Sequence, residues 1–522
     1  MKRPAIGTFV LRTVPLVAIV CLLWQSAPRW PDDWDGLGFL ASIDHFDLDK
    51  FAPHPPGYPV YVALLKLASL ALHEPVAAAT FVSIASALAT FLLVRATTVR
   101  LVVGFRIREK QALDEHEHAA AGAASASGAQ PSSRARARKM PRYHVPVPAD
   151  LRALVVAFAV TVTPLVWRVS SGVGTEALAL AFVALAAWGL ALQAPAAENT
   201  APPPRPAAAI LVGIAVGLGL GVRLSWAPLY LPLLLLNARG QRLRAAAVAA
   251  LAIAAWAVPL FAWVGPAHLV ELTRVHFAGH AARWGGTALT EPGIARLGFL
   301  ARDVLIDGFG GGGDVLGMAI ATLGAMVGLA SIYAWSQRRW RGAPAAALVL
   351  VPYAIWIALG QNLRQQPRHA LPLVVALTVG LALGAASVGR LRLITGALLL
   401  LVAVRTGQEA SDRRSMAPPG AQLVEWFRHE PERERAAVFG GATMRFFEGT
   451  DLAARAKLAG TVGDVTLALS KMRDYPDHVF VTSEVERLEE LSPPPKPVAT
   501  LCRPERIDRR APCVTVYEIG AR

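Results

Sequence analysis

The sequence predicts an all-α polytopic membrane protein that ends in a small extracytoplasmic α/β domain. Of its 522 residues, 54% are hydrophobic and only 17% are charged, whereas about 25% of the residues in a soluble domain are charged. Apolar runs long enough to cross a bilayer recur as far as residue 404. Beyond that point the chain becomes polar, and short strand-like runs replace the apolar segments.

The chain carries a strong excess of basic residues, with 52 Lys and Arg against 37 Asp and Glu and a net charge of +15. A soluble protein of this charge would be a candidate for nucleic-acid binding. Here the basic residues gather at the ends of apolar segments, as expected for cytoplasmic loops, and no nucleic-acid readout motif accompanies them. The charge therefore indicates topology, and we expect no nucleic-acid partner.

The N-terminal segment predicts the first membrane span and its direction. Lys2 and Arg3 precede an apolar run at 7–25, which carries the chain out of the cytoplasm. A secretory signal peptide begins similarly, but no small-x-small cleavage site follows this run, so we expect an uncleaved helix. The acidic, proline-rich residues that follow belong to an outer loop at 26–75.

The apolar run at 58–72 has two interpretations. If it crosses the membrane, the basic segment 98–150 lies outside. If it is an amphipathic helix in the interface, that segment lies inside, as the positive-inside rule favours. We therefore expect an interfacial helix followed, after one span, by a disordered cytoplasmic linker at 100–148, whose middle is rich in Ala, Ser and Gly.

The remaining apolar runs alternate in direction, and every strongly basic connection then falls inside. We expect about eleven spans in residues 1–404, in a cell inner membrane, with the N-terminus cytoplasmic and the C-terminus extracytoplasmic. A second long outer loop occupies 265–313. After 7–25 the expected spans are 76–97, 151–167, 176–193, two short helices within 207–236, 245–264, 314–335, 344–360, 370–388 and 393–404.

Residues 405–522 have the composition of a soluble α/β domain. The runs AAVFG, HVFVTS and CVTVYEI are strand-like, and helix-like stretches separate them. Cys502 and Cys513 lie in this polar region and are able to form a disulfide if the region is extracytoplasmic, but their spacing alone does not decide this.

The first outer loop is strongly acidic, with Asp32, Asp33 and Asp35 followed by Asp44, Asp47 and Asp49. Carboxylates this close to a bilayer are costly unless they are solvated or used. A carboxylate at the boundary between water and lipid is suited to accept a proton from an acceptor hydroxyl. A simple solvated loop is the alternative.

A rigid motif, HPPGYP at 54–59, leads from this loop into the helix at 58–72. Its prolines fix φ, and Gly57 permits a sharp turn. A purely structural turn explains the motif as well as a functional one.

These motifs together resemble the GT-C superfamily of membrane glycosyltransferases, and within it the HPPGYP-containing transmembrane O-mannosyltransferases and their bacterial relatives. In that family an Asp-Ser-Gly-Glu-like element precedes HPPGYPLY. Here Asp35-Gly36-Leu37-Gly38 precedes HPPGYPVY. The resemblance implies a GT-C-type domain with Asp35 as catalytic base, while Gly38 replaces the family's second carboxylate. It covers about residues 1–400 and excludes the C-terminal domain.

Further charged residues fit the same resemblance. Glu176, in Gly174-Thr175-Glu176-Ala177-Leu178, is similar to the family's Glu-x-x-Ala-Leu stretch, although a carboxylate at a helix N-terminus is also favoured by the helix dipole. PRHALPL at 367–373 resembles the RYLLPL element of many GT-C enzymes. Arg368, and with it Arg223, is therefore expected to bind the donor phosphate. Arg364 lies just before this stretch, and His369, which follows Arg368, is an expected substrate-binding residue. The alternative role of each arginine is an interfacial anchor.

The second outer loop contains His276 and His280, spaced to share one helix face. No Glu stands between them as in a zincin motif, so we expect substrate contact and no metal. The GFGGGG run at 308–313 lacks the Lys-Ser/Thr of a P-loop, which argues against nucleotide binding. Asp33, His54 and Tyr58 complete the set of expected substrate-binding residues.

The predicted function is transfer of a sugar from a polyprenyl-phosphate donor to an acceptor hydroxyl of a protein, lipid or glycan, with inversion and without a cofactor. Two alternatives remain open. A lipid-linked sugar flippase would show paired broken helices in two repeats, and the sequence has one broken pair and no convincing repeat. A non-catalytic membrane assembly protein would use the C-terminal domain to bind a partner.

Overall fold

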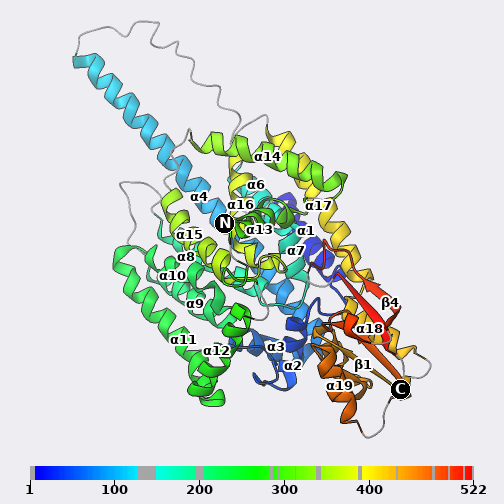
Figure 1. The fold of residues 1–522 in the computed structure, drawn as a ribbon. Coiled ribbons are helices and arrows are strands. Elements are labelled where there is room, and N and C mark those ends of the chain that lie inside the picture. The colour runs from blue at the N-terminus through cyan, green and yellow to red at the C-terminus, as the bar shows by residue number, and fades with distance from the viewer. Residues whose placement is uncertain are drawn as a thin grey trace.

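A helical membrane body and a small sheet-containing domain make up the molecule (Figure 1). The computed structural model describes residues 6–126, 148–194, 205–282, 286–291, 293–311, 313–336, 342–385, 391–430, 433–472, 476–491, 494–509 and 512–519. The helices of the body are α1 (Ile6–Gln25), α2 (Trp34–Asp44), α3 (Pro59–Leu72), α4 (Pro75–Ala126), α6 (Ala149–Thr161), α7 (Pro164–Ser171), α8 (Glu176–Gln193), α9 (Pro206–Val222), α10 (Ala227–Leu235), α11 (Arg242–Val264), α12 (Pro266–Ala282), α13 (Ala295–Leu305), α14 (Val315–Ser336), α15 (Ala343–Gly360), α16 (Leu371–Ala385) and α17 (Leu391–Ser415). The short 3-10 helices η1 (Leu224–Trp226), η2 (Arg239–Gln241), η3 (Asp307–Phe309) and η4 (Pro367–Ala370) join some of them.

The predicted spanning segments are helical. Among the described residues, 7 helices are long and apolar enough to cross a membrane, and the pair α6 and α7 raises this to 8 if the two form one span. The shorter apolar helices Leu16–Gln25, Pro206–Val222 and Leu224–Leu235 fall on the remaining predicted spans. The predicted polytopic helical fold is therefore confirmed.

One predicted span is not straight. The sequence predicts a single helix over 151–167, but α6 and α7 meet at a bend of 70°. Pro164 begins α7, and Thr163 before it has an extended conformation. Proline lacks an N–H donor and disfavours helical geometry in the preceding residue, so the prediction of one continuous helix was wrong at this position. Beyond the bend, α7 packs against α17 and η3.

Helices α3 and α4 cover the segments that the sequence predicts as an interfacial helix and as the start of a cytoplasmic linker. Helix α3 has 14 residues, fewer than the ~20 that cross a bilayer, and its Leu67 and Leu70 are exposed. This length supports an interfacial position. Helix α4 continues to Ala126, through the first part of the segment that the sequence predicts as a linker. Residues 127–147 of that segment lie outside the described residues.

Helices α18 (Pro419–Arg428) and α19 (Val462–Ser470) pack on a mixed five-stranded sheet in the C-terminal domain. The strands are β1 (Ala436–Gly440), β2 (Ala456–Leu458), β3 (His478–Thr482), β4 (Lys496–Cys502) and β5 (Cys513–Ile519), in the spatial order β2-β1-β3-β5-β4. The predicted strands correspond to β1, β3 and β5. Strand β1 pairs in parallel with β2 and β3, whereas β5 pairs antiparallel with β3 and β4.

The alternation of side chains along β1 explains why both faces of the sheet are covered. Val438 packs in the cluster that contains Phe427 of α18, while Phe439 packs in the cluster that contains Leu469 of α19. Successive strand residues point to opposite faces, so one hydrophobic strand supplies two cores. The sheet therefore lies between α18 on one face and α19 on the other.

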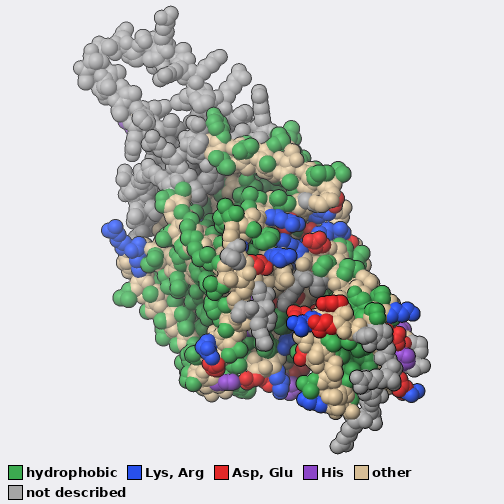
Figure 2. All heavy atoms as spheres, in the orientation of Figure 1, with side chains coloured by type: hydrophobic (Ala, Val, Ile, Leu, Met, Phe, Trp, Pro, Cys, Tyr) green, Lys and Arg blue, Asp and Glu red, His purple; other side chains and the backbone are tan. Residues whose placement is uncertain are grey.

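This domain lies against the same end of the body as α2 and α3 (Figure 1). Arg445 of the domain lies over the rings of Trp34 and Phe51, 5.4 and 5.3 Å from their centroids. Hydrophobic side chains cover much of the helical body in Figure 2, and charged side chains gather where the body meets the domain. The start of the acidic loop, at Trp34, thus lies beside the C-terminal domain.

Candidate active site

Helix α2 presents two carboxylates of the first outer loop. Asp33 caps this helix, and its Oδ1 accepts a hydrogen bond of 3.0 Å from the backbone N–H of Gly36. Asp35 lies in the first helical turn, where the helix dipole favours negative charge. At Gly38 a Cβ atom would collide with the carbonyl oxygen of Phe51. Glycine at this position therefore lets the loop around Phe51 pack closely on α2.

The HPPGYP motif turns the chain sharply into α3. Gly57 has φ +104° and Tyr58 has φ 50°, and Pro59 begins the helix. The Tyr58 hydroxyl lies 2.6 Å from Nε2 of His54, and Nδ1 of His54 lies 3.9 Å from Oδ1 of Asp35. The turn therefore brings both motif side chains to the candidate base.

Burial keeps the side chains of His54 and Tyr58 uncharged. Burial lowers the pKa of His54 to about 4; Asp35 opposes this change, and the cationic side chains of Arg368 and Arg223 add to it. Burial also raises the pKa of Tyr58 to about 12. At neutral pH both side chains are uncharged, so each is able to donate and accept hydrogen bonds.

Arg368 joins the acidic residues of three separate segments. Its Nη1 lies 3.0 Å from Asp33 Oδ2, its Nη2 bonds to Asp35 Oδ2, and its Nε lies 3.3 Å from Glu176 Oε1. The side chain is 20% exposed, so these charges are largely shielded from water. The planar guanidinium group is suited to such forked contacts with anions.

A second arginine, Arg223, contacts the same carboxylate of Glu176 as Arg368 does. Arg223 Nη1 lies 2.8 Å from Glu176 Oε1 and donates a hydrogen bond of 2.7 Å to Thr175 Oγ1. Its Nη2 lies 3.4 Å from Nδ1 of His369. Glu176 is thereby held between Arg223 and Arg368. The tight link 172–175 before α8 is fixed by Tyr61, whose hydroxyl accepts a hydrogen bond of 3.1 Å from Gly174.

Helix α12 contributes histidines to the other side of His54. The His276 ring stacks on the His54 ring at 5.4 Å, and the His280 ring lies 4.9 Å from that of His276. The pKa of His276 is lowered to about 4, chiefly by burial and in smaller part by His54 and His280, while Asp35 opposes the change. Within the described part of the chain, no group of three or more His, Cys, Asp or Glu side chains is arranged to hold a metal ion.

The structure brings all the predicted site residues into one connected cluster: Asp33, Asp35, His54, Tyr58, Glu176, Arg223, His276, Arg368 and His369. Arg364 stays outside it, with its side chain 65% exposed and 3.7 Å from Glu291. These residues are more than 300 positions apart at the extremes, and the fold brings them together.

A pocket opens beside Arg368, between the body and the C-terminal domain. Its walls combine carboxylates, guanidinium groups and side-chain amides with a few apolar residues: Asp32, Asp33, Leu165, Arg168, Val169, Gly172, Val173, Gly174, Glu176, Gln365, Gln366, Pro367, Arg368, Ile507, Asp508 and Arg509. Such a lining suits a ligand that carries both hydroxyl groups and negative charge.

Sequence reasoning missed several of these wall residues. Arg168 had a detectable signal, because it is an arginine at the outer end of a predicted span, like Arg368. Ile507 and Arg509 had no such signal, since nothing in the sequence indicates that the C-terminal domain folds back onto the membrane body.

Part of the chain is similar to a known protein family. Residues 50–239 match the family model described as the Protein O-mannosyl-transferase TMEM260 N-terminal domain. That range contains the HPPGYP motif, Glu176 and Arg223. The resemblance inferred from the sequence is confirmed.

The crystal structure of ArnT from Cupriavidus metallidurans bound to undecaprenyl phosphate is similar over 98% of this chain and 98% of its own, with 11% identity and a TM-score of 0.50. The chain has the GT-C fold. The apo state of the same ArnT aligns over 97% of both chains at 12% identity and a TM-score of 0.49. The Archaeoglobus fulgidus oligosaccharyltransferase in complex with Zn and sulfate aligns over 89% of this chain and 67% of its own, at 14% identity and a TM-score of 0.45. Among curated proteins, none matches the chain significantly.

The chain is a multi-pass membrane protein with a GT-C-like fold. Its partial match to a glycosyltransferase family model supports a membrane glycosyltransferase. The matched range ends before Arg368 and the C-terminal domain. The contacts of those parts therefore come from the structure of this chain alone.

Proposed function

We propose that this protein transfers a sugar from a polyprenyl-phosphate donor to a hydroxyl group of an extracytoplasmic acceptor, with inversion and with Asp35 as general base. One observation carries the proposal: the guanidinium group of Arg368 bonds to Asp35 and lies 3.0 Å from Asp33 and 3.3 Å from Glu176. A group suited to phosphate and a candidate base thus share one shielded cluster.

Donor binding and base activation are coupled in this arrangement. Phosphate oxygens compete for the same N–H groups of Arg368 that contact the carboxylates. When the donor phosphate takes these groups, Asp35 loses its strongest partner and becomes able to accept a proton. Arg223, held by Glu176 at 2.8 Å, adds positive charge on the same side of the site.

The reaction itself is a single displacement. Asp35 takes the proton of the acceptor hydroxyl as its oxygen bonds to the anomeric carbon. The bond from that carbon to the phosphate oxygen breaks, and its electron pair leaves with the polyprenyl phosphate, whose charge Arg368 stabilises. Attack opposite the phosphate inverts the anomeric centre. Asp35 then releases the proton to water.

The histidines and the tyrosine beside Asp35 are the proposed sugar contacts. His54 and Tyr58 are uncharged at neutral pH and lie 2.6 Å apart, so their lone pairs and protons suit sugar hydroxyls. His276 stacks on His54, and His369 lies against Arg223. Aromatic rings and neutral polar atoms at one place are typical of carbohydrate recognition.

The names of similar proteins suggest which substrates to test first. The matching family model is named for a protein O-mannosyl-transferase, so mannose and a serine- or threonine-containing peptide are the first sugar and acceptor. The ArnT structure contains undecaprenyl phosphate, which supports a polyprenyl carrier of that class.

The proposed orientation places the active site outside the cytoplasm of a cell inner membrane. The disulfide between Cys502 and Cys513 supports an oxidising compartment for the C-terminal domain. The distribution of basic loops supports a cytoplasmic N-terminus. We divide the chain into a GT-C-like membrane domain at 1–404 and an extracytoplasmic domain at 405–522, with α17 continuing across this boundary to Ser415.

The test is turnover by the purified protein in lipid nanodiscs with a panel of undecaprenyl-phosphate sugars and the peptide, a soluble glycan and a glycolipid as acceptors. We expect release of undecaprenyl phosphate and a glycosylated acceptor with at least one donor. Binding of donors without any turnover would contradict the proposal and favour a lipid-linked sugar flippase or a non-catalytic assembly protein.

A further inference from the structure

A disulfide closes the loop between β4 and β5, and this loop lies against the membrane body. Cys502 and Cys513 form the bond at the base of the loop, and they are also paired across the two strands. Within the loop, Arg503 is 3% exposed and Ile507 is 5% exposed. Burial of an arginine and an isoleucine in a surface hairpin shows that its packing partner is another part of the molecule.

The first contact joins the loop to the acidic outer loop. Arg503 Nη1 lies 3.0 Å from Asp32 Oδ1, and Arg503 Nη2 donates a hydrogen bond of 3.2 Å to the carbonyl of Arg413. The other carboxylate oxygen of Asp32 bonds to the Arg413 side chain. Although burial acts to raise the pKa of Asp32, Arg413 and Arg503 lower it to about 2. The carboxylate of Asp32 is therefore ionised, and each of its oxygens contacts a guanidinium group.

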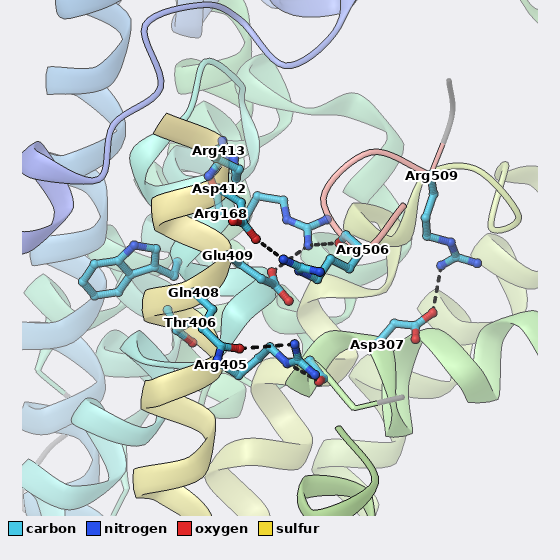
Figure 3. A network of polar contacts seen from close by, with 12 residues as sticks. Arg168, Asp307, Arg405, Thr406, Gln408, Glu409, Asp412, Arg413, Arg506 and Arg509 are labelled. Atoms are coloured by element: carbon cyan, nitrogen blue, oxygen red, sulfur yellow. Dashed lines mark hydrogen bonds and ion pairs between the residues drawn. The ribbon is translucent and has the colours of Figure 1, made fainter. Parts of the chain in front are cut away.

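A second set of contacts fixes the tip of the loop (Figure 3). Arg168 of α7 donates a hydrogen bond of 2.7 Å to the carbonyl of Arg506 and lies 2.9 Å from Glu409 of α17. The Arg506 side chain bonds to Asp412 of α17. These contacts connect the loop to two helices of the body at once.

The loop is also attached beside α13. Arg509 Nη1 lies 2.6 Å from Asp303 Oδ1 and 3.1 Å from Asp307 Oδ2. Figure 3 shows Arg509 reaching from the loop toward Asp307. The side chain of Asp303 is 0% exposed, so this ion pair is shielded. Between its attachments, Ile507, Asp508 and Arg509 form one wall of the pocket beside Arg368.

We propose that this disulfide-closed loop is a positioning element of the active site, with Arg503 holding Asp32 and thereby the segment that carries the candidate base. Asp32 directly precedes Asp33, which caps α2, so an anchored Asp32 fixes where α2 begins and where Asp35 points. This inference rests on the proposed glycosyl transfer. Arg503 acts through Asp32, which it contacts directly.

The first test removes the disulfide. The variant Cys502→Ser/Cys513→Ser is compared with wild type and with Cys21→Ser, which removes an exposed free thiol. Release of undecaprenyl phosphate from undecaprenyl-phosphate mannose is measured under oxidising conditions. We expect kcat to fall about 10- to 100-fold in the double variant, because small misplacements of catalytic groups cost this much, and to stay unchanged in Cys21→Ser. A double variant with wild-type kcat overturns the proposal.

The second test separates positioning from general destabilisation. Arg503→Met is expected to lower kcat about tenfold with little change in the donor KM, since Arg503 affects the chemical step through Asp32. Arg503→Lys should recover part of kcat because it restores one charge contact to Asp32. Arg487→Met, at a side chain 67% exposed in the same domain, is the matched control. Melting temperatures are recorded for each variant.

A double-mutant comparison decides whether Arg503 works through Asp32. Adding Arg503→Met to Asp32→Asn should cause little further loss, because the two residues act as one unit. Additive losses, or a loss of kcat that the Lys variant does not recover, contradict the proposal. If wild type itself releases no undecaprenyl phosphate from any donor, the proposed function fails and this inference falls with it. If wild type turns over and the loop variants match it, this inference alone is wrong.

Discussion

Arg223 and Glu176 form an ion pair of 2.8 Å in which the side chains are only 8% and 3% exposed. Glu176 also lies 3.3 Å from Arg368, so its negative charge is shared between two arginines of the candidate site. The pair joins the start of α8 to the residue between α9 and η1 and thus connects distant helices.

Glu176→Gln should therefore destabilise the protein strongly. Removing one partner of a buried pair leaves an uncompensated charge, which costs about 3–5 kcal/mol. Thermal unfolding in detergent measures the effect. Glu271→Gln is the control, because Glu271 and Arg274 form an exposed pair with side chains 55% and 70% exposed, and water screens the attraction between exposed charges so that removing one has little effect on stability. Equal melting temperatures for the two variants would contradict the buried-pair interpretation.

Arg368→Lys should weaken donor binding despite keeping the positive charge. Arg368 uses Nη1, Nη2 and Nε for its three carboxylate contacts, and a lysine ammonium does not reproduce this fork. Losing one charge-assisted hydrogen bond costs about 1.5–3 kcal/mol, or roughly 10- to 100-fold in affinity. Binding of undecaprenyl phosphate to the purified protein checks this. The exposed Arg364→Lys is the matched control and should bind as wild type does.

Stability should decline in mild acid because of the buried histidines. The pKa of His54 and that of His276 are both lowered from 6.5 to about 4. The unfolded chain takes up protons first as the pH falls, so the stabilisation is complete above pH 6.5 and is lost as the pH falls toward 4. Melting temperatures at about pH 7.5, 5.5 and 4.5 test this. His54→Gln should flatten the dependence, whereas the exposed His73→Gln should leave it unaltered.

Gly38 should not tolerate a side chain. Its Cβ would meet the carbonyl oxygen of Phe51, which is backbone and cannot rotate away. We expect Gly38→Ala to lower both the melting temperature and turnover by displacing the loop that leads to His54. Gly298→Ala serves as the control, since a Cβ atom at Gly298 would meet no atom of the described residues within 4 Å. A Gly38→Ala protein with wild-type turnover would show that the loop has room to adjust.

The helical fold was predictable because membrane spans leave a strong signal in apolar length and charge. The cluster around Arg368 was also accessible, since HPPGYP, Glu176 and PRHALPL mark it locally. The bend before α7 was missed because the apolar run conceals the effect of Pro164. The loop contacts of Arg503 were not predictable, because they join residues 471 positions apart in the sequence and depend on how two domains pack.

The measurement that tests the central claim most directly compares turnover of wild type with Asp35→Asn, using undecaprenyl-phosphate mannose and the acceptor that supports transfer. The amide keeps the shape of the carboxylate but accepts no proton, so we expect sugar transfer to fall below detection while the melting temperature and the binding of undecaprenyl phosphate remain measurable. Transfer by Asp35→Asn at the wild-type rate would contradict the assignment of Asp35 as the catalytic base.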